Sequence, residues 1–303
     1  MSKIVIVGSS NTDMVLKTAR FPKPGETIIG EDFFVFQGGK GANQAVAAAR
    51  LGSNVAFICK LGNDEFGKNA IQYYRNEGID VRGVFVDNTA STGVAVITVN
   101  GDGENSIVVA SGANNHLNVE DLQNAHGIME SSDWILTQLE IPVATIEYLA
   151  GYAREYRKKL ILNPAPATTL PSTVYEGLFL ITPNETETEL LTGVAIANED
   201  SLKQAVNIFK NRGVHNVIIT LGNRGAYVDC EEFSGYVDSF KVKSVDTTAA
   251  GDVFNGALLD ALSKNQSWKD ALSFASKAAA ISVTKMGAQP SAPTMREINN
   301  FVM

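Results

Sequence analysis

The sequence predicts an α/β protein in which helices cover both faces of a mostly parallel sheet, with a smaller β-sheet beside it. Two observations support this: short apolar runs alternate with longer amphipathic segments, and two β-rich segments interrupt that alternation. Strands buried on both faces read as continuous apolar runs, and parallel pairs need helical crossovers. In chain order, strands are expected at residues 4–7, 55–58, 134–139, 159–162, 179–181 and 216–220, and helices at 42–51, 66–76, 143–157, 185–191 and 253–262.

The two interrupting segments, residues 14–36 and 92–110, are expected to pair as the smaller sheet. Every second residue from Thr92 to Thr98 is Thr or Val, and Gly101-Asp102-Gly103 supplies a turn. We expect a β lid that closes over a ligand and excludes water from it. Residues 1–13, 37–91 and 111–303 would then form the nucleotide- and substrate-binding core. The alternative is a β excursion on the core sheet.

Composition indicates a globular protein and excludes two classes of partner. The 303 residues are 45% hydrophobic, enough to build one large domain or two ordinary ones. A formal net charge of -8 gives no basic field that would attract nucleic acid or an anionic membrane. The apolar run at 4–7 is too short for a secretory signal, and no stretch approaches the roughly 20 apolar residues of a membrane span. Cys59 and Cys230 stand far apart, so we expect no disulfide framework and a cytoplasmic location.

The first candidate site follows the first strand, where Gly8-Ser9-Ser10-Asn11-Thr12-Asp13 gathers hydrogen-bonding side chains. Ligands in parallel sheets bind beyond the carboxyl ends of the strands. An Asn side chain donates and accepts, whereas an ionised Asp only accepts, so Asn11 and Asp13 together can bind the hydroxyls of a polyol. An ordinary Asx-rich turn is the alternative.

The second candidate, Gly38-Gly39-Lys40-Gly41-Ala42-Asn43-Gln44-Ala45, opens an alanine-rich helix. Its glycines let the backbone approach a ligand closely. Lys40 adds a cationic donor, and Asn43 lies in the first helical turn. A glycine-rich turn that only starts a helix would explain the same string.

A third glycine-containing string, Gly62-Asn63-Asp64-Glu65-Phe66-Gly67-Lys68-Asn69, has the spacing of a phosphate-binding loop. Asn69 replaces the hydroxyl residue that such a loop uses to bind magnesium. Asp64 and Glu65 would also place two carboxylates inside a loop meant for phosphates. We therefore interpret this string as a turn that starts a helix.

The strongest catalytic candidate is Asp246-Thr247-Thr248-Ala249-Ala250-Gly251-Asp252, which precedes an amphipathic helix. The small residues Ala249, Ala250 and Gly251 leave backbone N–H groups open at a helix N-terminus, which is an anion site suited to phosphoryl oxygens. Asp252 could accept a proton from an attacking hydroxyl, a role that supplies about 10²- to 10⁴-fold in rate. As a structural residue it would only complement the helix dipole.

Two further strings end predicted strands at the ligand-binding edge. In Thr182-Pro183-Asn184-Glu185-Thr186-Glu187, Asn184 and Glu187 are one helical turn apart and could organise a hydrated magnesium ion, or could simply cap a helix. Thr220-Leu221-Gly222-Asn223-Arg224-Gly225 offers a glycine-bearing turn suited to the approach of phosphate.

Taken in this order, the strings resemble the ribokinase family, also called the PfkB carbohydrate kinases, from Lys3 to Ser291. The strings at 38–45 and 246–256 resemble the N-terminal and C-terminal signatures of that family. The 38–45 string, Asn163-Pro164-Ala165-Pro166-Ala167 and Gly287-Ala288-Gln289-Pro290-Ser291 resemble its ribose branch rather than its fructose-phosphate or adenosine branches. Two positions depart from the pattern: Ser276 stands where a ring or amide often meets adenine, and Val253 where Thr is common.

The resemblance implies a three-layer ribokinase-like fold and ATP-dependent phosphorylation of D-ribose at its 5-hydroxyl, with Asp252 as general base. It implies an anion hole at Ala249, Ala250 and Gly251. The sugar-binding residues would be Asn11, Thr12, Asp13, Gly39, Lys40, Gly41, Asn43, Glu140 and Asp252. The ATP-binding residues would be Asn184, Thr220, Leu221, Gly222, Asn223, Arg224, Gly225, Gly251 and Ser276.

The resemblance also implies two metal ions. Glu187 would help to order Mg²⁺ through water, and K⁺ would activate the enzyme. The potassium site would be formed around Asp246, Thr248, Ser282, Lys285, Gly287 and Ser291, mostly by backbone carbonyls. A second copy would cover the exposed lid edges, so we expect a homodimer. A kinase for another sugar or nucleoside, or a nucleotide-binding regulator without catalysis, are the alternative functions.

Overall fold

A large twisted sheet forms the centre of the computed structural model, which describes residues 3–301. Within that range the sheet has nine strands in the order β13-β12-β11-β10-β9-β8-β1-β4-β5. Strands β11 to β5 in this order are parallel, whereas β12 and β13 are antiparallel additions at one edge. The strands are β1 Lys3–Val7, β4 Asn54–Gly62, β5 Asp80–Asp87, β8 Trp134–Thr137, β9 Lys159–Leu162, β10 Leu180–Ile181, β11 Asn216–Thr220, β12 Ala226–Asp229 and β13 Ser234–Val237.

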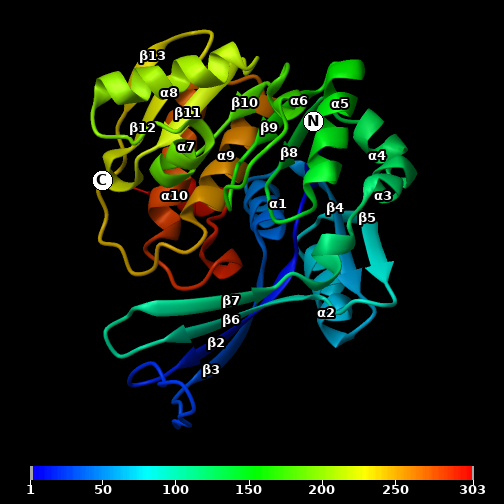
Figure 1. Cartoon of the computed structure of the whole chain (residues 1–303), viewed down its shortest axis with the longest axis vertical. Coiled ribbons are helices and arrows are strands. Elements are labelled where there is room, and N and C mark those ends of the chain that lie inside the picture. The colour runs from blue at the N-terminus through cyan, green and yellow to red at the C-terminus, as the bar shows by residue number, and fades with distance from the viewer. Residues whose placement is uncertain (1–2, 302–303) are drawn as a thin grey trace.

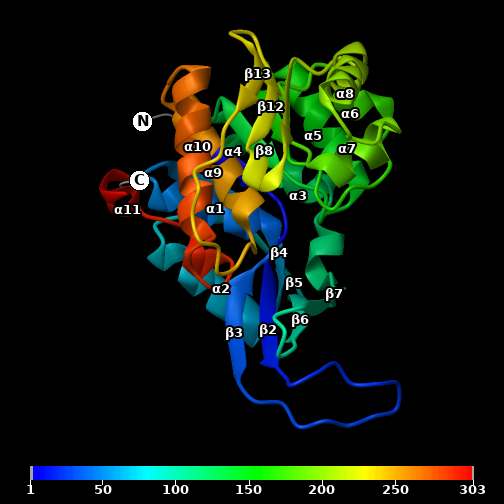
Figure 2. The ribbon, with the colours of Figure 1, turned by 90° about the vertical axis from the view of Figure 1, so that its left-hand side faces the viewer.

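Helices cover both faces of this sheet, as Figure 2 shows, and form a separate hydrophobic core on each face. Alternate side chains of a strand point to opposite faces, so Ile4 and Ile6 join one core while Val5 and Val7 join the other. The predicted three-layer α/β fold is confirmed. One face carries α1 Lys40–Arg50, α2 Glu65–Asn76, α9 Ala250–Ser263, α10 Trp268–Ser282 and α11 Met295–Asn300. The other carries α3 Val119–Asn124, α4 His126–Glu130, α5 Val143–Glu155, α6 Ser172–Tyr175, α7 Glu185–Thr192 and α8 Glu199–Asn211.

Three short 3-10 helices complete the regular structure between residues 3 and 301: η1 Gly112–His116, η2 Gly222–Arg224 and η3 Gln289–Ser291. Among the helices of this range, none combines the length and the apolar character needed to cross a bilayer.

Helices α1 and α9 pack closely because small residues line their contact. A Cβ atom on Gly256 would lie 2.7 Å from the carbonyl oxygen of Gln44 and 2.9 Å from the Cβ of Ala47. The alanine-rich sequence of α1 therefore does more than favour a helix, since it lets α9 approach. The close contact brings the first turns of the two helices to the same edge of the sheet.

A smaller sheet with the order β3-β2-β6-β7 projects from the larger body (Figure 1). Its strands are β2 Asn11–Lys17, β3 Phe33–Gly38, β6 Gly93–Val99 and β7 Asn105–Ala110. Strand β2 begins at Asn11, ahead of the segment expected at 14–36, because residues from Asn11 onward pair with both β3 and β6. Residues 18–32 form no strand. The division of the chain into core and lid remains a prediction.

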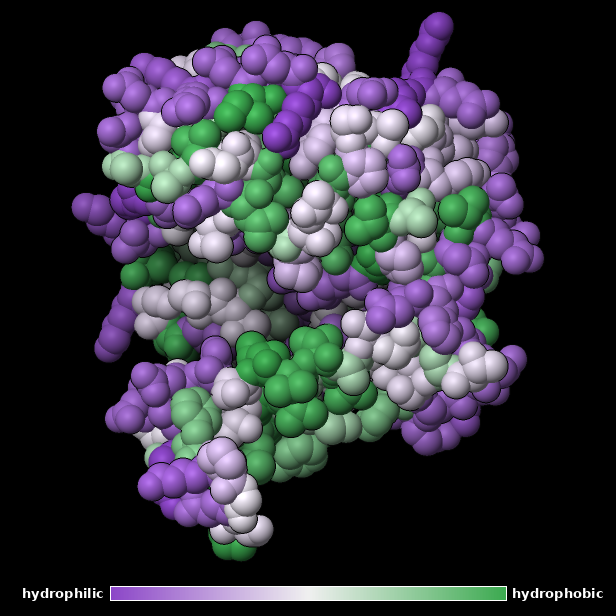
Figure 3. Space-filling view, viewed as in Figure 1, coloured by the Kyte–Doolittle hydropathy of each residue, from purple (hydrophilic) through white to green (hydrophobic). Residues whose placement is uncertain are grey.

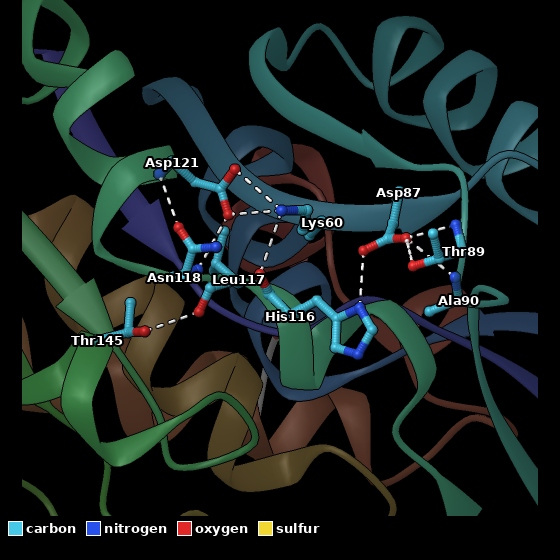
Figure 4. A network of polar contacts seen from close by, with 9 residues as sticks. All are labelled: Lys60, Asp87, Thr89, Ala90, His116, Leu117, Asn118, Asp121 and Thr145. Atoms are coloured by element: carbon cyan, nitrogen blue, oxygen red, sulfur yellow. Dashed lines mark hydrogen bonds and ion pairs between the residues drawn. The ribbon is translucent and has the colours of Figure 1, made fainter.

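A polar network fixes the segment that returns from the smaller sheet to the core (Figure 4). The ammonium group of Lys60, on β4, donates to the carbonyl oxygen of His116 at 3.2 Å and forms an ion pair with Asp121 at 2.9 Å. His116 Nδ1 lies 2.7 Å from Oδ2 of Asp87, the last residue of β5. The end of η1 is thus held by two strands of the larger sheet.

Most predicted elements are present with shifted ends. The strand expected at 134–139 stops at Thr137, and the helix expected at 253–262 already begins at Ala250. Gln138 and Glu140, the polar residues that follow Thr137, lie outside the strand, and their side chains bind to residues of the site described below.

The string at 62–69 is a turn that starts α2, which confirms the interpretation from its sequence. Asp64 is the N-cap: its Oδ1 accepts hydrogen bonds from Gly67 N at 2.8 Å and from Thr92 Oγ1 at 2.7 Å. Its Oδ2 accepts from Thr92 N at 2.8 Å. The carboxylate is therefore used to tie α2 to the start of β6. Burial would raise the pKa of Asp64, but these donors together lower it below its usual value.

Replacing Asp64 should weaken the fold without touching the candidate site. We expect Asp64→Ala to lower the free energy of unfolding by about 1–2 kcal/mol, because a helix cap is lost and the N–H of Thr92 loses its acceptor. Urea unfolding measures this change. The control is Glu65→Ala, whose carboxylate is exposed and paired only with Lys68; it should change stability by less than about 0.5 kcal/mol. Equal effects of the two substitutions would contradict the prediction.

Candidate active site

Asp252 lies in the first turn of α9 and is only 5% exposed. Its Oδ2 accepts a hydrogen bond from Asn43 Nδ2 at 2.9 Å, and its Oδ1 accepts one from Gln44 Nε2 at 3.0 Å. Burial raises the pKa of Asp252, while the Lys40 ammonium and these two amides oppose the rise. The group is a buried carboxylate held by neutral donors, as a general base would be.

Glu140 connects the end of β8 to the start of α1. Its Oε2 accepts hydrogen bonds from Ser9 Oγ at 2.5 Å and from Lys40 N at 3.1 Å, and Gly41 N donates to Ser9 Oγ at 3.3 Å. Four residues from three segments that are distant in sequence are thus brought together at the carboxyl ends of β1 and β8. Of these, Ser9 was not among the candidate binding residues.

The charged candidates act on one another, which places them in one site. Burial, together with the nearby carboxylates of Glu140 and Asp252, raises the pKa of Asp13 to about 7, although Lys40 opposes the shift. Asp252, and to a lesser degree Glu140, Glu187 and Asp13, raise the pKa of Lys40 above its usual value despite burial. Lys40 therefore remains a cation among four carboxyl groups.

Asn11 is fixed by a partner that the sequence did not indicate. Its Oδ1 accepts from Asn114 Nδ2 at 2.7 Å, and Oδ1 of Asn114 in turn accepts from Ser10 N at 2.9 Å. Asn11 and Asp13 share a face of β2, whereas the intervening Thr12 points to the other face, where its hydroxyl is buried. A sugar-binding role for Thr12 remains a prediction.

Two glycines give the sugar-side candidates room. A Cβ atom on Gly38 would lie 2.2 Å from Oδ2 of Asp13. Gly39, the N-cap of α1, has φ of 87°, and a Cβ there would lie 2.7 Å from the backbone nitrogen of Asn11. A larger residue at Gly38 would displace the side chain of Asp13, and one at Gly39 would collide with the backbone of Ser10 and Asn11.

A cavity of about 520 Å³ lies beside the N-terminus of α9. Six of the nine candidate ATP-binding residues line it: Thr220, Gly222, Asn223, Gly225, Gly251 and Ser276. Its remaining wall includes Phe240 and Val242, which the sequence did not single out, and Phe254, Ala279 and Val283. The cavity therefore combines an apolar wall with glycine-bearing turns.

The other three ATP candidates lie outside that lining. Leu221 is buried in the core, and Arg224 forms an ion pair with Glu185. Asn184 caps α7: its Oδ1 accepts from Glu187 N, while Glu187 Oε2 accepts from Asn184 N, both at 2.8 Å. Asn184 is nevertheless paired with Thr220 in an isolated bridge, next to the cavity.

The start of α9 has the form of an anion site. No side chain caps this helix, and the first helical hydrogen bond runs from Val253 N to Ala249 O at 2.9 Å. Ala249 itself takes a left-handed conformation with φ of 60°. Ala250 and Gly251 line the cavity, which places the N-terminus of α9 at its wall. Strain at a non-glycine residue of this kind is typical of functional sites.

Four of the six candidate potassium residues lie in two loops that Asp246 joins; Ser282 ends α10 and Ser291 ends η3. Asp246 Oδ1 accepts from Thr248 N, and its Oδ2 accepts from Gly287 N, both at 2.9 Å. The amine of Lys285 is engaged by Glu297, and Ser291 Oγ donates to Ala288 O. Within residues 3–301 no cluster of three or more His, Cys, Asp or Glu could hold a metal ion.

Buried amides are the part of the site that the sequence did not reveal. Gln44 is hydrogen-bonded to both Gln138 and Asn163 beneath Asp252. Gln44 and Asn163 stand in strings that were noted for their resemblance, but the sequence does not indicate that their side chains are in contact. The available signal was Asn163, which directly follows the strand predicted at 159–162, whereas Gln138 was placed inside a predicted strand and Gln44 inside a predicted helix.

The comparisons with known proteins agree with this geometry. The chain matches the pfkB family of carbohydrate kinases over residues 1–295. It is 44% identical to a ribokinase of Haemophilus influenzae, covering 99% of this chain and 98% of that one. It is 35% identical to a deoxyribokinase of Salmonella typhi, covering 99% and 98%.

A solved structure of an Arabidopsis thaliana ribokinase complexed with ribose and ATP superposes with a TM-score of 0.90 at 31% identity, covering 99% of each chain. The agreement in sequence and in fold spans both signature strings, the smaller sheet and the site between them. This chain therefore belongs to the pfkB family of carbohydrate kinases.

Proposed function

We propose that this chain transfers the γ-phosphoryl group of ATP to the 5-hydroxyl of D-ribose, giving ribose 5-phosphate and ADP. The observation that carries the proposal is the position of Asp252. It lies between a cluster of polyol-binding side chains and a helix N-terminus that opens into a nucleotide-sized cavity. The ribokinase relatives support ribose as the acceptor, and the deoxyribokinase relative makes 2-deoxyribose its main competitor.

In the proposed reaction, Asp252 accepts the proton of the 5-hydroxyl as the oxygen attacks the γ-phosphorus in line. A new O–P bond forms, and the bond between the γ-phosphorus and the bridging oxygen of ADP breaks. Asn11, Asp13 and Glu140 would hold the other hydroxyls, so that the attacking oxygen is positioned before the reaction. Positioning and charge stabilisation supply most of the catalysis in phosphoryl transfer.

Charge on the transferred group would be stabilised by the first turn of α9 and by Lys40. Gly251 lines the nucleotide cavity, so backbone N–H groups of this turn and the helix dipole would supply partial positive charge there. These donors are fixed before the reaction, and therefore they favour the charge distribution of the transition state.

Mg²⁺ would accompany ATP, with Glu187 ordering it through water. Burial raises the pKa of Glu187, the hydrogen bond from Asn184 N and the charge of Lys40 oppose this rise, and the charge of Asp252 adds to it. Magnesium keeps several waters and uses few carboxylates, which fits a site with one such residue. When bound, the ion would neutralise phosphate charge.

Potassium would act beside the anion hole. The two loops that Asp246 joins present backbone carbonyl oxygens, which suit a hard monovalent cation and tolerate changes of side chain. The proposed ligands lie around Asp246, Thr248, Ser282, Lys285, Gly287 and Ser291. A cation there would add positive charge near the start of α9.

The smaller sheet would serve as the lid and also as the dimer contact. In Figure 3 a hollow separates this sheet from the main body, and apolar side chains gather on the sheet. Phe33, Val35, Ile107 and Val108 are each at least 48% exposed. A second copy would cover such a surface, which is large for a monomer, and the mass of the protein in solution would test this.

The two unpaired cysteines support a cytoplasmic location.

The function is tested by ADP release from Mg-ATP with ribose, 2-deoxyribose, fructose 6-phosphate or adenosine, each with and without K⁺. We expect ribose to give the highest kcat/KM and K⁺ to raise turnover. Activity with another acceptor but not with ribose would keep the kinase assignment and make that acceptor the substrate. Inactivity with all four would favour a regulator over a kinase.

Asp252→Asn should lower kcat for ribose by at least about a hundredfold, because the amide cannot accept the proton. Ribose affinity should change little, since the shape of the side chain is kept. The matched control is Asp260→Asn on the same helix, where a buried Asp is held by Ser53 and Lys264. It should reduce stability and leave kcat nearly unchanged. Retained turnover in Asp252→Asn would remove this residue from the role of base.

Ribose affinity should fall as the pH drops below about 7, the pKa of Asp13. The protonated carboxyl accepts fewer hydrogen bonds, so affinity should weaken by up to about tenfold per pH unit below that value. Calorimetric titration with ribose in the absence of nucleotide measures this slope. Asp13→Asn should bind more weakly and independently of pH. An unchanged slope in Asp13→Asn would assign the titration to another carboxyl.

A further inference from the structure

A ring of buried hydrogen bonds runs beneath Asp252 and returns to the residue before it. Gln44 Nε2 donates to Asp252 Oδ1 and to Asn163 Oδ1, both at 3.0 Å. Asn163 Nδ2 donates to Thr182 O at 3.3 Å, and Thr182 Oγ1 donates to Asn255 Oδ1 at 2.7 Å. The ring closes where Asn255 Nδ2 donates to Gly251 O at 2.8 Å.

The ring joins α1, the ends of β9 and β10, and α9. All four side chains that form it are at most 7% exposed. Breaking one bond would leave a buried polar atom without a partner, so each bond restrains the next. The ring thereby fixes both the carboxylate of Asp252 and the peptide of Gly251 at the anion site.

The direction of the Gln44 amide is set by a further residue. Gln138 Nε2 donates to Gln44 Oε1 at 2.5 Å, so the amide nitrogen of Gln44 is turned toward Asp252. The reverse orientation would place an oxygen against the carboxylate and two amide nitrogens against each other. Gln138, directly after β8, is fully buried. Gln44 is thus held in one orientation by its own neighbours.

From this geometry we propose that Gln44 is a positioning residue that orients the proton-accepting carboxylate of Asp252, and that Gln138 fixes the direction of Gln44. The inference rests on the role of Asp252 proposed above. Asn43 also holds Asp252, but it stands at the sugar-binding mouth, and its Oδ1 is buried without a partner among residues 3–301. Asn43 is therefore only partly held by the network, whereas every polar atom of the Gln44 side chain is used in it.

The test is the dependence of kcat on pH in Gln44→Met, at saturating ribose and Mg-ATP. Methionine keeps the volume but cannot donate to Asp252. The charged groups that act on Asp252 from neighbouring elements, Asp13, Lys40, Glu140 and Glu187, stay in place. Loss of a donor to the carboxylate should raise the pKa of Asp252. The acid limb of the profile of kcat against pH should therefore shift to higher pH by about one unit. At neutral pH, kcat should fall about tenfold while KM for ribose changes less than about twofold.

Gln138→Met provides a second variant that does not touch Asp252. It frees the Gln44 amide to turn, so the acid limb should move in the same direction by a smaller amount. The control is Asn216→Ala, which removes a buried amide at the opposite end of β11, where it bonds to Phe179 O and Glu231 N. This control should lower thermal stability and leave the acid limb in place.

The outcomes separate this inference from the function on which it rests. An unmoved limb in a folded Gln44→Met, or in Gln138→Met where the first variant fails to fold, would overturn the positioning role. So would an equal movement in Asn216→Ala, because the shift would then reflect general loss of stability. If Asp252→Asn is inactive in the same assay, the kinase assignment stands whichever way the Gln44 result falls.

Discussion

The burial of one carboxylate at the start of α9 is the constraint on which the rest of the site depends. An ionised carboxylate cannot leave water unless hydrogen bonds or charges compensate it. Asp252 receives these from Asn43, Gln44 and the nearby Lys40. None of them would reach it if α1 and α9 were further apart, and the contact at Gly256 is what allows their approach. Small residues in two helices are therefore as necessary to the site as its polar residues.

The smaller sheet contributes residues to the candidate site, and this would link its position to a ligand bound there. Asn11 and Asp13 lie on β2, between β3 and β6, while the residues that hold Asp252 belong to the larger body. A ligand that contacts both sets must hold the two sheets in one relative position. On the other side, the network of Lys60, Asp87 and His116 fixes the return of the chain to the core. Motion of the sheet would therefore be a rotation about fixed ends, not a separation.

The sequence predicted the layers of the fold and most strand positions, because parallel strands buried on both faces leave continuous apolar runs. It also predicted that the turn at 62–69 starts a helix, since Asp64 and Glu65 are incompatible with bound phosphate. It did not predict that β2 begins at Asn11, because pairing with two neighbouring strands overrides the turn preference of Asn and Asp. Nor could it predict that Gln44, Gln138 and Asn163 meet, since their contact depends on the order of strands in the sheet.

The choice of neutral donors around Asp252 has a chemical reason. A general base works best when its pKa is near the working pH, because it must be ionised before the reaction and still attract a proton during it. A buried carboxylate bound directly by Arg would be ionised but weakly basic, and one without any partner would stay protonated. A carboxylate held by two amide donors, with one cation nearby, has a basicity between these extremes. The amides also have a fixed direction, which Lys alone would not supply. In the proposed role of base, the bonds that set the basicity of Asp252 would therefore also set the direction of the oxygen that accepts the proton.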